Sequence, residues 1–393
     1  MRIRTQVGIV GAGPAGLFLA HLLHLENIDS LIVERSTQQH TIERVRAGVL
    51  EQATVDLMVE TGLGERVRRE GIRHGGVYLA FLGRRHRIDF EDLTGGRAIT
   101  IYGQNELIKD LIAARGASER PLYYEVEQVS IAALDTSRPR IRFRQAEQEH
   151  EVECDFLAGC DGSHGVCRTS IPTAGLTIFT REYPLGWLGI LARAAPSSAE
   201  LVYALHPRGF ALFSMRSAEV TRLYLQCSPE EDPDRWTGDA IWSELEARLE
   251  TSDGWRPNRG DILQKGVTGM RSLVVEPMRY GRLFLAGDAA HIVPPTGAKG
   301  LNLAVADVKA LSNAIAAYYR ERRTDLLDGY SGRRLPRVWR AQRFAWWMTS
   351  LLHRFPGGCP FDYRRQIAEL EYLTSSRAAM TTLAENYVGL ALE

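Results

Sequence analysis

An α/β fold is predicted for this chain of 393 residues, with a βαβ unit at its start, a β-rich middle and a helical end. Residues 6–10 form a short β-branched run, which is followed by a Gly-rich turn and by apolar residues at helical spacing. A second apolar run at 31–33 completes the pattern of a strand, a helix and a parallel strand. After Gly297 the apolar spacing is again helical.

Further elements are predicted from local composition and periodicity. Strands are expected at β-rich or alternating stretches, which are 77–81, 99–102, 140–144, 151–156, 187–191, 210–214 and 222–226. Helices are expected at 301–319, at 337–353 and, as one last segment, at 364–386. The middle of the chain should therefore hold a substantial second sheet.

Length, charge and cysteine content limit the class of protein. A chain of this length exceeds a single hydrophobic core, so we expect two interlocked domains or one large two-layered unit. The formal net charge of zero leaves no basic surplus for nucleic acid. No segment has the pattern of a signal peptide or the apolar length of a membrane span, so a cytoplasmic protein is expected. The five cysteines form no CxxC pair, which favours reduced thiols and no metal site.

A glycine pattern, Gly11-x-Gly13-x-x-Gly16, occupies the turn after the first strand. One glycine makes the tight turn, one lets a pyrophosphate approach the backbone, and one lets the helix and strand pack closely. Glu34 ends the second strand, where a carboxylate can accept hydrogen bonds from an adenosine ribose. In this context the pattern predicts Rossmann-like binding of a dinucleotide, either FAD or NAD, rather than a solvated Gly-rich turn.

Two later segments have a related form. Asp161-Gly162 follows an apolar strand, and Gly287-Asp288 ends another strand just before a Gly-rich helix entry at 294–302. These three segments, in this order, resemble the flavoprotein aromatic hydroxylases. The resemblance extends from Val7 to residue 389.

The resemblance implies an FAD-binding Rossmann-like βαβ domain interlocked with a β-sheet substrate domain and a C-terminal helical region. The FAD-binding parts are expected at 1–75, 101–180 and 271–320, and the substrate parts at 76–100 and 181–270. A helical or interface region is expected at 321–393. The family also implies a homodimer.

The activity implied by the resemblance is that of an FAD-dependent monooxygenase. It would hydroxylate 4-hydroxybenzoate at position 3 to 3,4-dihydroxybenzoate (protocatechuate), with NADPH and O2 and through a flavin 4a-hydroperoxide. Two alternatives stay open: a hydroxylase of a ring-substituted phenolic acid, and a non-catalytic binding protein with a flavin-type fold.

The same resemblance implies which residues bind the cofactor. Gly11, Gly13, Gly16 and Glu34 would hold the ADP half of FAD, and Asp288 the ribityl chain. A helix that starts near 296–300 would point free N–H groups and its positive dipole end at the flavin. The other positions that match cofactor contacts of the family are Arg44, Arg46, Gln104, Asp161, Arg222, Lys299, Gly300, Leu301 and Asn302.

The substrate residues are also implied by the resemblance. Ser214 and Arg216 would hold a carboxylate, which suits the planar fork of a guanidinium, and Tyr224 would add a hydrogen bond. At the other end of the substrate, the phenol would meet a catalytic hydroxyl relay with a proton exit toward solvent. The groups implied there are Tyr203, Tyr387, the Pro295 carbonyl and His74.

Taken singly, these side chains have plainer interpretations. Tyr203 and Tyr387 are more often packed aromatics, Ser214 a strand hydroxyl and His74 a surface loop residue. For Lys299 the alternatives are an exposed charge at a helix start and a charge that supports the reduced flavin or its hydroperoxide.

The choice of nicotinamide depends on the segment after Glu34, which governs NADPH against NADH use in the family. Ser36 and His40 depart from the strongly NADPH-specific pattern, whereas Arg35 can pair with a 2′-phosphate. We therefore expect NADPH, with NADH as a possible second donor.

Overall fold

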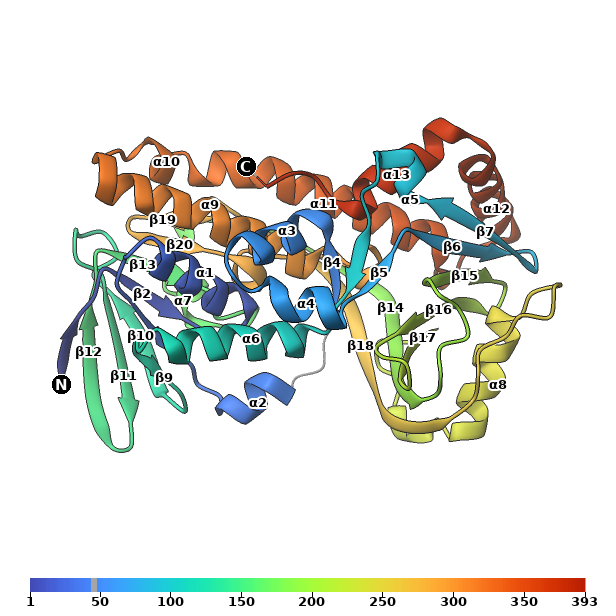
Figure 1. Ribbon diagram of the computed structural model, residues 1–393, viewed down its shortest axis with the longest axis horizontal. Helices are drawn as coiled ribbons and strands as arrows, with labels where there is room; N and C mark the ends of the chain where they lie inside the picture. Colours follow the sequence, from blue (N-terminus) through green and yellow to red (C-terminus); the bar gives the residue numbers. More distant parts are fainter. Residues whose placement is uncertain (44–47, 393) are drawn as a thin grey trace.

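Two large sheets organise the fold, one in each half of the molecule (Figure 1). The computed structural model describes residues 1–43 and 48–392. The six-stranded sheet has the order β19-β20-β13-β2-β3-β9, and all its pairs except β19 with β20 are parallel. Its strands are β2 (Val7–Val10), β3 (Ser30–Val33), β9 (Leu122–Tyr123), β13 (Phe156–Gly159), β19 (Arg279–Tyr280) and β20 (Leu283–Leu285).

The βαβ unit predicted for the chain start is confirmed. Helix α1 (Pro14–Leu25) connects β2 to β3, which pair in parallel. Every residue of β2, β3, β13 and β20 is buried. Near-continuous apolar runs of this kind are typical of parallel strands that are covered on both faces. Helix α1 packs against α6 (Gln104–Ala117) and α9 (Gly300–Glu321).

The eight-stranded sheet has the order β21-β18-β14-β17-β16-β15-β6-β7. It is antiparallel except where β15 pairs with β6 in parallel. Its strands are β6 (Gly76–Phe81), β7 (Arg84–Asp89), β14 (Thr177–Arg193), β15 (Val202–His206), β16 (Gly209–Met215), β17 (Thr221–Cys227), β18 (Asp261–Glu276) and β21 (His291–Ile292). This is the second sheet that the β-rich middle of the sequence predicts.

Smaller elements complete the fold. One four-stranded sheet contains β1 (Arg2–Arg4), β12 (Gln148–Glu153), β11 (Arg140–Gln145) and β10 (Glu127–Ala132), and a three-stranded sheet contains β4 (Val49–Glu51), β8 (Ile99–Ile101) and β5 (Ile72–His74). The remaining helices are α2 (Gln38–Glu43), α3 (Gln52–Glu60), α4 (Gly64–Glu70), α5 (Phe90–Thr94), α7 (Val166–Thr169), α8 (Gly238–Leu249), α10 (Asp325–Asp328), α11 (Tyr330–Leu352), α12 (Pro360–Ser375) and α13 (Arg377–Val388). Short 3-10 turns lie at Thr173–Gly175 (η1), Pro233–Arg235 (η2), Gly287–Ala289 (η3) and Pro295–Gly297 (η4).

Two long strands join the halves of the molecule. β14 and β18 pair from Thr177 opposite Glu276 to Arg193 opposite Asp261, and in Figure 1 β18 descends from the centre toward the lower right. Buried apolar side chains form two clusters. The first cluster consists of buried side chains within 7–67, 102–171 and 273–338. The second consists of those within 77–101, 183–270 and 344–388. The domain limits expected from the sequence stay a prediction, because the clusters divide 321–393 between them.

The structure differs from the sequence-based expectation at several element boundaries. The last segment, expected at 364–386, consists of two helices, because Ser376 ends α12 and its side chain accepts from the Ala379 N–H at the start of α13. Helix α11 begins seven residues earlier than expected and contains Pro336, because Tyr330 and Arg334 in its first turns are anchored in the core. The stretch 151–156 is divided between β12 and β13, and 187–191 is part of the longer β14.

No helix in the described part of the chain has the combination of length and apolar character needed to cross a membrane.

A buried carboxylate links several of these elements. Asp307 of α9 accepts from His291 Nε2 at 2.6 Å, from Arg334 Nε of α11 at 3.0 Å and from the Gly287 N–H at 3.1 Å. The Asp307 side chain is fully buried and that of Arg334 is 2% exposed. Burial alone would raise the pKa of Asp307, but its contacts with His291 and Arg334 hold it below the usual range. The carboxylate therefore carries the charge that Arg334 needs.

We expect Asp307→Ala to lower the free energy of unfolding by about 3–5 kcal/mol, because it leaves the Arg334 guanidinium buried without its counter-ion. The measurement is the urea midpoint at pH 7. The matched control is Asp325→Ala, which removes an exposed pair with Arg323 and should change the midpoint little. Since the folded pKa of Asp307 is depressed, its contribution is present above about pH 4 and lost as the pH falls through the folded value. Equal shifts in the two variants would contradict the assignment.

Candidate functional site

The three turns singled out in the sequence lie together at the carboxyl ends of neighbouring parallel strands. Strands β2, β13 and β20 are adjacent, and the turns follow them directly. A Cβ placed on Gly11 would lie 2.4 Å from the Cys160 carbonyl oxygen, and one on Gly287 would lie 3.4 Å from Ala15 Cβ of α1. In open α/β sheets, ligands bind at this edge.

The first turn has the free space that a phosphate group requires. Gly11 has φ +104°, which an L side chain rarely adopts, and a Cβ on Gly16 would lie 1.9 Å from the Gly11 carbonyl oxygen. A Cβ on Gly13, in contrast, would meet no atom within 4 Å. Gly13 caps the start of α1 without a side-chain hydrogen bond, so the first N–H groups of that helix are available to an anion. The turn therefore fits the pyrophosphate of a dinucleotide.

Glu34 lies beside this turn, where the sequence predicts it. Its Oε2 accepts from the Ala12 N–H at 2.7 Å, and its Oε1 from the Ser36 N–H at 2.8 Å. The carboxylate thus shapes the Gly-rich turn itself. Each oxygen keeps a second lone pair that can accept from a ribose hydroxyl.

The second turn is held by a carboxylate and tied to the third turn by an arginine. Asp161 Oδ2 accepts from the Cys167 N–H at 2.8 Å, at the start of α7. Burial raises the pKa of Asp161, against the opposing effect of that hydrogen bond. Arg168 donates to the Ser163 carbonyl at 2.6 Å and to the Ala289 carbonyl at 3.2 Å. The sequence contains Arg168 close to this motif, but only the fold reveals that it bridges two turns.

The start of α9 offers a second set of N–H groups. Neither an acidic residue nor a side-chain cap occupies its first turn, and a Cβ on Gly300 would meet only Val293 Cγ2, at 3.9 Å. Gly287 packs against Ala304 of this helix, which brings Asp288 and the α9 start close to α1. Leu301 is half-buried in the same first turn. These residues fit an elongated cofactor that extends from one helix start to the other.

Asn302 is fully engaged by the protein. Its Oδ1 accepts from the Glu51 N–H and the Thr54 hydroxyl, both at 2.9 Å, and its Nδ2 donates to the Val49 and Ala298 carbonyls. The side chain therefore fixes α9 to β4 and α3. Its contact with a flavin stays a prediction.

The expectation that Lys299 could be an exposed charge is wrong. The residue is 5% exposed, and its Nζ donates to Glu51 Oε1 at 2.7 Å and to the Tyr387 carbonyl at 3.0 Å. Burial lowers the pKa of Lys299, and Glu51 opposes that shift. Glu51 was missed in the sequence because it lies 248 residues away, and no local pattern connects the two.

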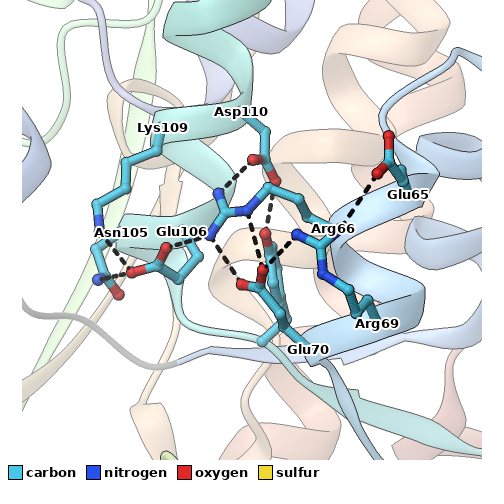
Figure 2. Close-up of polar contacts among 9 residues, drawn as sticks. Glu65, Arg66, Arg69, Glu70, Asn105, Glu106, Lys109 and Asp110 are labelled. Carbon is cyan, nitrogen blue, oxygen red and sulfur yellow. Dashed lines mark hydrogen bonds and ion pairs between the residues drawn. The ribbon is translucent and has the colours of Figure 1, made fainter.

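Helix α6, which begins at Gln104, takes part in an ion-pair network near its start (Figure 2). Arg66 of α4 reaches Asp110 at 2.5 Å, Glu106 at 2.6 Å and Glu70 at 2.8 Å. The network fixes the first turns of α6 to α4. Arg44 and Arg46, which are also expected to contact the cofactor, lie outside the described residues.

One face of the large sheet brings the substrate residues together. Tyr203 of β15 is opposite Leu212 of β16, Leu212 is opposite Tyr224 of β17, and Tyr224 is opposite Gly189 of β14. Directly opposed residues point to the same face, so these four positions form a row across four strands. In the next row, Ser214 is opposite Arg222, whose guanidinium lies 5.1 Å from the Tyr224 ring centroid.

Arg216 continues this surface from the end of β16. A Cβ placed on Gly48 would lie 2.8 Å from Arg216 Nη1, so the guanidinium lies against the backbone there. Burial lowers the pKa of Arg216 and the neighbouring Tyr224 opposes that shift. The guanidinium nevertheless stays charged near pH 7.

Two tyrosine hydroxyls lie in direct contact. Tyr203 Oη and Tyr387 Oη are 2.5 Å apart, and Tyr203 also donates to the Thr296 carbonyl at 3.2 Å. The Pro295 carbonyl accepts from the Ala298 N–H at 2.9 Å, and its expected contact with the substrate phenol stays a prediction. Burial raises the pKa values of both tyrosines, so both hydroxyls are neutral at physiological pH.

The alternative of a surface loop residue is wrong for His74. It lies in β5, is fully buried and, among the described residues, has no hydrogen-bond partner for either ring nitrogen. Burial lowers the pKa of His74 to about 4, so its ring is neutral near pH 7. Its part in a proton path stays a prediction.

A buried pair beside the row, on the same face of the sheet, was missed in the sequence. Trp187 Nε1 donates to His353 Nε2 at 2.7 Å, and the Trp187 ring lies 4.7 Å from that of Tyr224. Burial lowers the pKa of His353 to about 3, which keeps Nε2 free to accept. The two residues are 166 positions apart, and only the packing of α11 on the sheet unites them.

The nicotinamide segment lies at the surface. Arg35 and His40 are exposed at the end of β3 and in α2, and the Ser36 N–H is bonded to Glu34. The segment is therefore accessible to a ligand, and its selectivity stays a prediction.

Comparisons with known proteins agree with this geometry. The family described as FAD binding domain matches residues 4–345. A p-hydroxybenzoate hydroxylase from Acinetobacter baylyi is 45% identical over 391 residues, which cover 100% of this chain and 96% of the relative. A 12-dehydrotetracycline 5-monooxygenase/anhydrotetracycline 6-monooxygenase from Streptomyces rimosus is 26% identical over 348 residues, 85% of this chain and 67% of the relative.

A solved structure shares the fold along the whole chain. The p-nitrophenol 4-monooxygenase PnpA from Pseudomonas putida DLL-E4 superimposes with a TM-score of 0.83 at 18% identity, covering 99% of each chain. That likeness is evidence of the fold alone. The family match over most of the chain and the full-length relative together show that this chain belongs to the flavoprotein aromatic hydroxylases of the FAD-binding family.

Proposed function

We propose that this chain hydroxylates 4-hydroxybenzoate at position 3, forming 3,4-dihydroxybenzoate with NADPH and O2. The observation that carries the proposal is the contact between the Tyr203 and Tyr387 hydroxyls, on the sheet face that also bears Ser214 and Tyr224. The name of the full-length relative from Acinetobacter baylyi supports the same substrate.

The row of side chains suits a single aromatic ring with a polar group at each end. Tyr203 and Tyr224 lie on strands separated by one other strand, which is about 10 Å between backbones. Arg216, Ser214 and Tyr224 would bind the substrate carboxylate at one end, and Tyr203 would meet the phenol at the other. Leu212 lies between the two tyrosines and would contact the ring.

The cofactor would lie along the edge formed by the three turns. The α1 start would bind its pyrophosphate, Asp288 its ribityl hydroxyls, and the α9 start the flavin ring. When bound, FAD supplies hydride acceptance from the nicotinamide and the activation of O2 for transfer of one oxygen atom.

The tyrosine pair would take the proton of the phenol. A phenolate gives far more electron density to its ortho carbon than a phenol does, so deprotonation activates the ring. With its O–H directed at the Thr296 carbonyl, Tyr203 can accept a hydrogen bond from the phenol. When that O–H turns to Tyr387, Tyr203 can take the phenol's proton as it gives its own to Tyr387, and it can then donate to the phenolate. Tyr387 is placed to pass the proton onward, because either hydroxyl can be the donor in their shared bond.

Four further assignments belong to the proposal. NADPH is the expected reductant because Arg35 is exposed beside Glu34. The cytoplasm and a homodimer are proposed from the cysteine pattern and from the family respectively. The domain limits are proposed as given above, with the two clusters of buried side chains as their support before residue 321.

Anaerobic mixing of the FAD-loaded protein with NADPH should bleach the flavin absorbance, and 4-hydroxybenzoate should accelerate that bleaching. The physical reason is that the bound carboxylate and phenol would complete the polar surface next to the expected flavin position. The measurement is stopped-flow absorbance with and without substrate. Benzoate, which lacks the phenol, is the control ligand. A bleaching rate that is insensitive to 4-hydroxybenzoate would favour a simple flavin reductase.

Tyr203→Phe should lower the rate of product formation by about 10²-fold while flavin reduction continues, because the phenol loses its proton acceptor. NADPH would then be consumed with release of hydrogen peroxide. Product and peroxide are measured together against NADPH used. The control is Tyr78→Phe on the neighbouring β6, whose side chain lies on the opposite face of the sheet. Hydroxylation at an unchanged rate in Tyr203→Phe would contradict the relay.

Arg35→Ala should raise KM for NADPH about tenfold and leave KM for NADH nearly unchanged, because a charge-assisted hydrogen bond to the 2′-phosphate is lost. Initial rates with each donor test this, with NADH as the internal control. Equal changes for both donors would place the 2′-phosphate elsewhere.

A further inference from the structure

A short irregular segment after α13 is held by cationic side chains from distant parts of the chain. We call residues 389–392 the tail segment; it contains neither helix nor strand. Arg97 Nη1 donates to the Gly389 carbonyl at 3.0 Å. Arg337 donates to the Leu390 carbonyl at 2.9 Å and to the Ala391 carbonyl at 2.7 Å. Three successive carbonyls are therefore bound by two guanidinium groups.

These contacts continue the hydrogen bonds at the end of α13. The last carbonyls of a helix have no partners within it, and cations at that end are favoured by the helix dipole. Lys299 Nζ donates to the Tyr387 carbonyl, and Arg97 and Arg337 bind the carbonyls that follow. Each bond is to the backbone, so together they fix the path of the chain.

The backbone at Gly389 has no space for a side chain. Gly389 has φ +88°, and a Cβ there would lie 1.9 Å from Glu51 Oε2. Glu51 accepts from Lys299 and has an oxygen 3.8 Å from Arg337 Nη2. One buried carboxylate thus lies between Lys299, which binds the Tyr387 carbonyl, and Arg337, which binds the tail segment.

Tyr387 is two residues before the tail segment. Its ring packs at 5.1 Å from the Phe90 ring and at 6.3 Å from the Phe344 ring, which restrains its sideways position. A displacement along the axis of α13 would be opposed by the bonds at the helix end. A displacement of about 1 Å would turn the 2.5 Å contact with Tyr203 into a poor hydrogen bond.

We propose that Arg97 and Arg337 are positioning residues for the proton relay, acting through the tail segment to hold the Tyr387 hydroxyl against that of Tyr203. The proposal rests on the proposed function of the tyrosine pair. It concerns the ionisation of the bound phenol, since a correctly placed hydroxyl pair favours the phenolate. Carboxylate binding by Ser214 and Arg216 should be left intact.

The test uses the full-length, FAD-loaded protein with Arg97→Ala, Arg337→Ala and the double variant. The ionised fraction of bound 4-hydroxybenzoate is measured by its absorbance across pH, and product formed per NADPH is measured beside it. We expect the double variant to raise the apparent pKa of the bound phenol by about one unit, a tenfold loss in its ionisation constant. Product per NADPH should fall severalfold while substrate affinity changes little.

Two variants serve as controls. Arg337→Lys keeps a cation that can reach one carbonyl, so it should restore part of the wild-type pH profile. Arg340→Ala removes an exposed arginine three residues along the same helix and should match the wild type in every measurement. An unaltered pH profile and coupling in the double variant would overturn the proposal. The same conclusion follows if all its rates fall only in proportion to the loss of folded protein.

Hydrogen exchange of the α13 amides separates this proposal from the proposed function, because it needs no substrate. The double variant should exchange the last turn of α13 about tenfold faster than the wild type. Unchanged exchange would overturn the positioning role of Arg97 and Arg337, whatever the substrate is. Wild-type protein that neither ionises nor hydroxylates 4-hydroxybenzoate would overturn the proposed function. Faster exchange in the double variant would then still support the positioning role of Arg97 and Arg337.

Discussion

The arrangement of the site depends on the hydrogen bonds and ion pair of one buried carboxylate, that of Asp307. It joins the Gly287 turn, β21, α9 and α11 at one point, and both α9 and α11 supply groups to the site. The α9 start faces the expected flavin position, and α11 carries Arg337. A carboxylate without exposure to water requires partners in fixed positions. The same charge that satisfies Arg334 therefore joins α9 to α11 beside the Gly287 turn.

Much of the fold follows from local sequence patterns. The βαβ unit, the β-rich middle and the helical end were all predictable, because each depends on periodicity within a few residues. The division between α12 and α13 was not, since Ser376 ends one helix and caps the next through a single side-chain contact. Pro336 likewise lies inside α11, where tertiary burial of Arg334 outweighs the local preference for a break.

In the candidate site, too, some residues could be predicted from the sequence and others could not. The glycine turns and the row of tyrosines could be located from motifs and from a family resemblance. The partners that hold them could not, because Glu51, His353 and Arg97 contact residues between 166 and 292 positions away. Such long-range contacts produce no periodic pattern in the sequence. The bond from the Tyr203 hydroxyl to the Thr296 carbonyl is likewise one that spacing alone does not reveal.

The long separation between the two tyrosines has a consequence for the newly made protein. Tyr203 leaves the ribosome 184 residues before Tyr387, and the tail segment follows later still. Domains fold as units as they emerge, so the nucleotide edge, whose turns end near Asn302, can form before the last helix docks. A nascent chain would thus acquire the means to bind a flavin before it acquires the hydroxyl pair that is proposed to take the proton of the phenol. On the proposed function, docking of α13 is the step that completes the proton relay.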